Sequence, residues 1–164
     1  MTDFLAYLQQ SAFSTWVRES GSLYSFPGIL LLHTYGMAIV VGIVAAIDLR
    51  ILGFAPALPL GPIAKFLPLV WGAFLVNAIT GTILLVADAS TWLHNWDFGV
   101  KMLFIALAVL NQFAIQKRVL GDERLDKGPF SMHAKMLAGA SLVCWIGAIT
   151  AGRLLAYVGG NGLK

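Results

Sequence analysis

The chain has 164 residues, of which 59% are hydrophobic and 12% charged, and its mean hydropathy is +0.81. Soluble domains are nearer to half apolar and a quarter charged, and a chain this short leaves much of its surface exposed, so the composition excludes an ordinary soluble domain and indicates a membrane protein. The formal charge of +3 does not indicate nucleic-acid binding, because most basic residues lie between apolar runs, where they orient membrane proteins.

The N-terminal segment has an amphipathic pattern. Within residues 2–17, apolar side chains recur at three- and four-residue spacings, at Phe4, Leu5, Leu8, Ala12 and Trp16. This spacing predicts a short helix with one apolar face. Such a helix either lies in the membrane interface or packs on the end of a helix bundle, and the sequence leaves both interpretations open.

Four apolar runs follow, each long enough to cross a bilayer as a helix. They cover residues 27–49, 63–87, 98–117 and 132–157. The proline-rich residues 54–62 and the Gly128-Pro129 pair interrupt helix formation between runs. The sequence therefore predicts an all-α fold, an integral membrane four-helix bundle with a short N-terminal interfacial helix, in a single transmembrane domain.

Basic residues are distributed unevenly between the two sides of this bundle. One side carries Arg50, Lys65, Lys117, Arg118, Arg124, Lys127 and Lys135, whereas the other carries Arg18 and Lys164 outside the apolar runs. Because basic residues are retained in the cytoplasm, this asymmetry predicts that both termini lie outside it.

Small residues predict where helices approach closely. Ala38, Gly42 and Ala46 are spaced by four in the first run, and Gly147, Ala148, Ala151 and Gly152 repeat this pattern in the last. Small residues at such spacings are typical of close contacts between membrane helices. The single cysteine, Cys144, lies within an apolar run and is interpreted as a small buried hydrophobic residue.

Ionisable residues at one depth form the main candidate site. His33 lies six residues into its run, on the order of 9 Å below the boundary at 1.5 Å per residue. Asp88, Lys101 and Arg153 fall at a similar depth in the other runs, with His94 just above them. Such residues are costly in hydrocarbon, so a group of them is a candidate functional site. A purely structural interpretation is also open: Lys101 and Arg153 can snorkel to the boundary, Asp88 can pair with Lys101, and His33 can bond a neighbouring hydroxyl or carbonyl.

This layer suggests a b-type haem site. His33 and His94 are candidate axial ligands of the iron, and Lys101 and Arg153 are candidate partners of the propionates. His133 begins the last run on the other side, so it is excluded as a partner of His33. A copper site built on His33 and Met37 is an alternative, although two ligands are few.

Two other functional classes stay open. Asn77, Thr80, Asn111 and Gln112 place polar groups at middle depth, which suits a small ion or metal transporter, although buried amides more often join helices. A non-catalytic assembly subunit would use the outer layer of His33, Asp88, Lys101 and Arg153 to bind lipid, a partner helix or a second copy. The nucleotide-binding, zinc-hydrolase and esterase motifs are missing from the sequence, which favours a protein that is not an enzyme.

Several motifs carry a resemblance to a known family. The chain contains WVRES, LLHTYGMAIVVG, DLRILG, TGTILLVADAS, FGVKMLF and AGRLLAY. It resembles small bacterial four-span inner-membrane proteins that share a domain of unknown function, and distantly the CopD-type and b-type cytochrome bundles. The resemblance implies a four-helix bundle in a bacterial inner membrane, where the termini that the basic residues place outside the cytoplasm would be periplasmic. It carries over His33, Asp48, Arg50, Lys101 and Arg153, whereas His94 and His133 depart from the pattern.

Asp48 and Arg50 close the first run. Residues two apart on a helix do not face each other, so we expect each to find a partner elsewhere. Arg50 fits the positive side of the membrane, and Asp48 is expected to contact the connection that carries Lys117 and Arg118.

Overall fold

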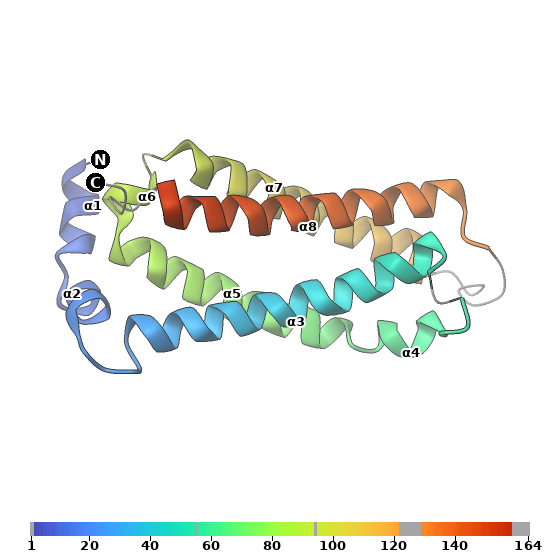
Figure 1. The fold of residues 1–164 in the computed structure, drawn as a ribbon, viewed down its shortest axis with the longest axis horizontal. Coiled ribbons are helices and arrows are strands. Elements are labelled where there is room, and N and C mark those ends of the chain that lie inside the picture. Colours follow the sequence, from blue (N-terminus) through green and yellow to red (C-terminus); the bar gives the residue numbers. More distant parts are fainter. Residues whose placement is uncertain (1, 55, 94, 122–128, 159–164) are drawn as a thin grey trace.

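The computed structural model describes residues 2–54, 56–93, 95–121 and 129–158, and the regular structure in these ranges is entirely helical (Figure 1). Four long helices run side by side: α3 (Phe26–Leu52), α5 (Leu67–Ala87), α7 (Trp96–Ile115) and α8 (Met132–Val158). Each lies in a segment that is long and apolar enough to cross a membrane. The predicted all-α membrane bundle is therefore confirmed.

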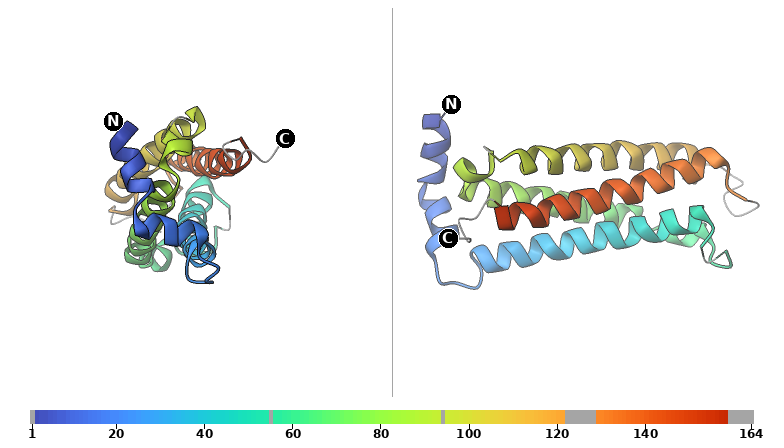
Figure 2. Two further views of the ribbon diagram at one scale, coloured as in Figure 1. Left: turned by 90° about the vertical axis from the view of Figure 1, so that its left-hand side faces the viewer. Right: turned by 45° about the horizontal axis from the view of Figure 1, so that its top comes forward.

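Contacts inside the bundle follow a simple order. Helix α3 packs against α5 and α8, and α7 packs against α8, as the end-on view in Figure 2 shows. Two apolar clusters fill the interior. The central cluster contains Val40, Val44, Val70, Ala73, Ala108 and Trp145, and the second contains Ile47, Ile51, Leu60, Ile115, Val119, Ala134 and Ala138. Many large apolar side chains on the long helices point outward, as lipid-facing residues do.

Two segments depart from the continuous helices that the apolar runs suggested. The second run is divided into α4 (Leu60–Ala64) and α5, because Pro68 at the start of α5 lacks an N–H and its ring crowds the carbonyl of residue 64. The third span continues beyond α7 in a π-helical turn, Gln116–Leu120, which extends it to Leu120.

The N-terminal segment forms two short helices across one end of the bundle. Helices α1 (Thr2–Gln9) and α2 (Ala12–Glu19) meet at Ser11, whose hydroxyl accepts a hydrogen bond from the Ser14 backbone N–H. Arg18 donates to the carbonyls of Gln9 and Ala87, the latter at the C-terminus of α5. These hydrogen bonds attach the segment to the end of the bundle, which is one of the two interpretations that the sequence left open. Helix α6 (Ala89–Leu93) lies at the same end.

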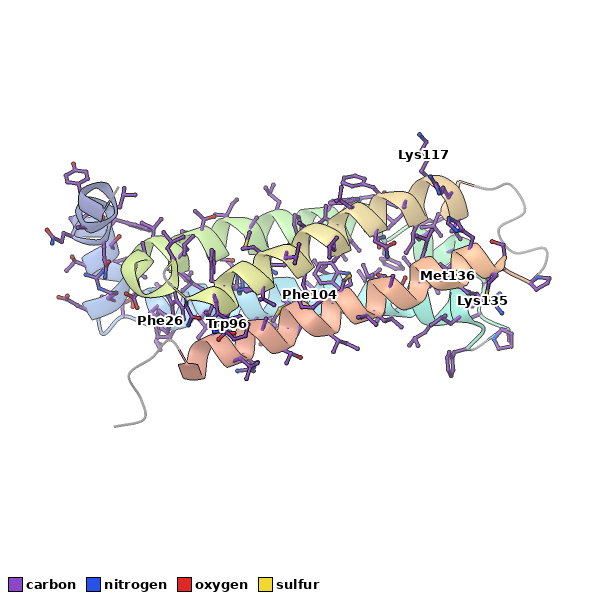
Figure 3. All side chains as sticks on the ribbon, turned by 90° about the horizontal axis from the view of Figure 1, so that it is seen from above. Phe26, Trp96, Phe104, Lys117, Lys135 and Met136 are labelled. Carbon is purple, nitrogen blue, oxygen red and sulfur yellow. The ribbon has the colours of Figure 1, made fainter. Side chains whose placement is uncertain are left out.

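Basic residues gather at the opposite end of the bundle. Figure 3 labels Lys117 and Lys135 there, with Phe26 and Trp96 at the α1 end. Arg50, at the end of α3, donates to the Leu58 carbonyl, and its guanidinium carbon lies 5.5 Å from the centre of the Phe130 ring. The basic side and the other side predicted from the sequence are thus the two opposite ends of the bundle. Which end faces the cytoplasm stays a prediction.

Small residues make close contacts on α8 but not at the positions expected on α3. Ala148 and Ala151 are buried, and a Cβ at Gly147 would lie 2.7 Å from the Phe104 ring, which sits between α7 and α8 (Figure 3). On α3, Gly42 has open space around it, so the prediction for that stripe was wrong. Gly36 makes the close contact instead.

Gly36 offers a direct test of the α3–α5 packing. A Cβ at this position would lie 3.2 Å from the Ala73 carbonyl oxygen, a backbone atom that cannot move without separating the helices. We expect Gly36→Val to lower the free energy of unfolding by about 1–3 kcal/mol, the usual cost of overpacking. The measurement is the thermal unfolding midpoint in detergent.

Gly42→Val is the matched control, because it carries the same β-branched side chain on the same helix into open space. Equal midpoints for the two variants would contradict the packing described for Gly36.

Candidate functional site

His33 lies at the α1 end of the bundle, half-buried between α3 and α5. Its Nδ1 is 3.0 Å from the Thr80 hydroxyl oxygen. The Thr80 hydroxyl donates to the Val76 carbonyl at 2.8 Å. In the tautomer that carries its proton on Nδ1, His33 donates to the Thr80 oxygen, and Nε2 carries the lone pair.

A glycine lets the imidazole lie against α5. A Cβ at Gly81 would be 3.0 Å from His33 Cε1 and 3.6 Å from Nδ1, so any larger residue would push the ring away from Thr80. The pair between His33 and Thr80 is thus set by the sequence of both helices.

Lys101 approaches this position from α7. Its stem lies along α8 at Gly152, where an added Cβ would be 3.6 Å from Cε and 3.8 Å from Nζ. The ammonium thus lies between α7 and α8, on the third and fourth spans. Within the described ranges Lys101 forms neither a hydrogen bond nor an ion pair. Asp97, one turn earlier, is buried yet is not within ion-pair distance of it.

The remaining residues of the expected layer have other surroundings. Asp88 accepts a hydrogen bond from Gln9 Nε2 at 3.2 Å and does not pair with Lys101. Arg153 is exposed on α8. His94 lies outside the described residues. The structure therefore joins His33 to Thr80 and places Lys101 on α7 against Gly152 of α8. We call His33, Thr80 and Lys101 the His33 layer.

A second group of polar residues, which the sequence did not identify as a site, lies deeper in the bundle. Asp48 and Ser141 have no exposed surface and Gln112 is 2% exposed. Ser141 is close enough to influence the Asp48 carboxylate, yet neither side chain completes a hydrogen bond of normal geometry. We call these three residues the Asp48 layer. Asp48 forms no ion pair with Lys117 or Arg118, and it shares its helix face with buried Val44 and Ile51. Residues 122–128 of that connection lie outside the described ranges, so its expected contact stays a prediction.

The other polar residues at middle depth serve mainly as helix contacts. Asn111 donates from Nδ2 to the Leu137 carbonyl at 2.8 Å, joining α7 to α8. Asn77 packs beside Gly36. His133, at the end remote from His33, has its Nε2 3.2 Å from Arg118 Nη1 and accepts from it. Cys144 is partly buried against the central cluster.

Comparisons with protein-family models, curated proteins and solved structures found no match. The chemistry of the two layers is therefore argued from their own side chains. Across the described ranges, no group of three His, Cys, Asp or Glu side chains could hold a metal ion. The His33 layer offers one imidazole on α3 and one ammonium on α7.

Proposed function

We propose that this integral membrane protein is a non-enzymatic, redox-associated accessory protein that holds a b-type haem at the His33 layer. The observation that carries the proposal is the bond from His33 Nδ1–H to Thr80. Histidines that ligate metals almost always donate their second ring N–H to a fixed acceptor, which sets the tautomer and the ring orientation. His33 has this arrangement, with Nε2 left to ligate iron.

Lys101 supports the same ligand. A half-buried ammonium inside a membrane bundle is costly unless an anion accompanies it. Within the described residues Lys101 has no such partner, and a haem propionate would provide the missing negative charge. His94 remains the sequence-based candidate for the second axial position. The bound haem would supply one-electron exchange, and the protein would set its position and electrostatics.

Titration of the purified, haem-free protein with haem b tests this function. We expect a Soret band that saturates at one haem per chain. His133→Ala is the control histidine variant, since His133 is exposed, bonds Arg118 and lies at the opposite end of the bundle, so its titration should match the wild type. A wild-type protein that gives only non-saturating absorbance would overturn the proposal, as would loss of binding in His133→Ala.

A further inference from the structure

The Asp48 layer is enclosed by apolar residues above and below. On α3, Asp48 lies between Val44 and Ile51. Gln112 lies at the equivalent position on α7, between Ala108 and Ile115. Ser141 lies at the equivalent position on α8, between Ala138 and Trp145. All six apolar neighbours belong to the two buried clusters. The three polar side chains are thus directed into the bundle interior rather than toward lipid or headgroups.

The polar atoms of this layer lack partners. Both carboxylate oxygens of Asp48, both amide atoms of Gln112 and the Ser141 hydroxyl oxygen are buried without a hydrogen bond of normal geometry to a described residue, although Ser141 lies close to the Asp48 carboxylate. Nearly all buried polar atoms in proteins are satisfied, so such a group of exceptions requires an occupant. Arg50 does not supply the counter-charge, because it is engaged with Leu58 and Phe130.

The polar atoms of the Asp48 layer indicate which kind of ligand it would bind. Four of the five unpartnered atoms are oxygens, from a carboxylate, an amide and a hydroxyl, and oxygen atoms are the ligands that hard cations prefer. Gln112 Nε2 and the neighbouring Trp145 Nε1 are buried N–H donors that face the same region and do not ligate a cation. One carboxylate balances one positive charge, whereas a divalent ion would leave a buried excess charge. We propose that the Asp48 layer binds a monovalent hard cation of the size of Na⁺, ligated by Asp48, Gln112 and Ser141.

This site is separate from the His33 layer. Asp48 and His33 are about four helical turns apart on α3, or about 22 Å at 1.5 Å per residue. The central apolar cluster, including Val40 and Val44, lies between them. Cation binding therefore does not depend on haem binding, and either can fail alone.

Thermal unfolding of the purified protein in detergent tests the cation site. A cation that binds the folded state raises the unfolding midpoint in proportion to the logarithm of its concentration once the site is nearly saturated. We expect the midpoint to rise when NaCl replaces choline chloride at constant ionic strength, and to rise less with KCl. Asp48→Asn should lose this Na⁺-dependent rise. Ser141→Ala, which retains the charge, should weaken the apparent Na⁺ affinity about tenfold, the equivalent of one ligand contact.

Asp97→Asn is the matched control, because Asp97 is also a buried aspartate but lies at the α1 end, and it should keep the full Na⁺ response. Coincident curves in choline, Na⁺ and K⁺ for the wild type would show that water or a proton satisfies the layer, and would overturn the proposal. An equal loss in Asp97→Asn and Asp48→Asn would also overturn it. If Asp48→Asn does not fold, Ser141→Ala decides the assignment, and an unchanged Na⁺ affinity in that variant contradicts it.

Discussion

His33→Ala abolishes the saturable Soret band, and Thr80→Val weakens haem binding by about 10- to 100-fold, the usual effect of removing the group that orients a metal-ligating histidine. Valine has nearly the shape of threonine but cannot accept the bond from His33 Nδ1–H, which is 3.0 Å long. The imidazole then loses its fixed tautomer and orientation while Nε2 remains in place. Haem titration followed at the Soret band measures both effects.

Thr82→Val is the control for the threonine substitution. Thr82 lies on the same helix, is exposed, and bonds the Ala78 carbonyl at 2.8 Å in the same way that Thr80 bonds Val76. It should bind haem as tightly as the wild type. Identical haem affinities in Thr80→Val and Thr82→Val would show that the bond between His33 and Thr80 serves only to pack α3 against α5.

Asp48→Leu stabilises the protein in Na⁺-free choline buffer. Asp48 is fully buried among apolar neighbours, and its carboxylate has no hydrogen bond with a described residue. Replacing buried charged groups with apolar residues of similar volume is often stabilising by about 1–4 kcal/mol, because the desolvation penalty is removed. The unfolding midpoint in choline should therefore rise, while in saturating Na⁺ the advantage over the wild type should shrink or reverse.

Asp97→Leu should behave in the opposite way. Asp97 lies in the first turn of α7, where a negative charge interacts favourably with the helix dipole, so its removal should lower the midpoint. A fall in the midpoint of Asp48→Leu in choline would mean that the carboxylate already makes a stabilising interaction without added cation.

The four spans were predictable because lipid demands long, continuous apolar segments, and hydropathy reports this directly. Interruptions within the helices were harder to predict from the sequence. The effect of Pro68 depends on the carbonyl four residues earlier, and it separates α4 from α5. The break at Ser11 comes from a side-chain cap, whose bond to Ser14 is formed only in the folded segment.

Depth along a helix was predictable from the sequence, whereas rotation about the helix axis was not. Depth predicted one level for His33 and Lys101. Rotation decides whether a residue faces a neighbour: Gly42, against expectation, faces open space, and Asp48 faces the interior. The buried residues Val40, Val44, Ile47 and Ile51 share the face of Asp48, and this spacing was the signal that would have identified it.

The reduced-minus-oxidised absorption spectrum of the protein purified from haem-supplied cells tests the proposed function most directly, because it requires no reconstitution. The site built from His33, Thr80 and Lys101 predicts a red protein with Soret and α bands in the wild type and none in His33→Ala. A colourless wild-type protein, folded and recovered from cells with ample haem, would contradict it.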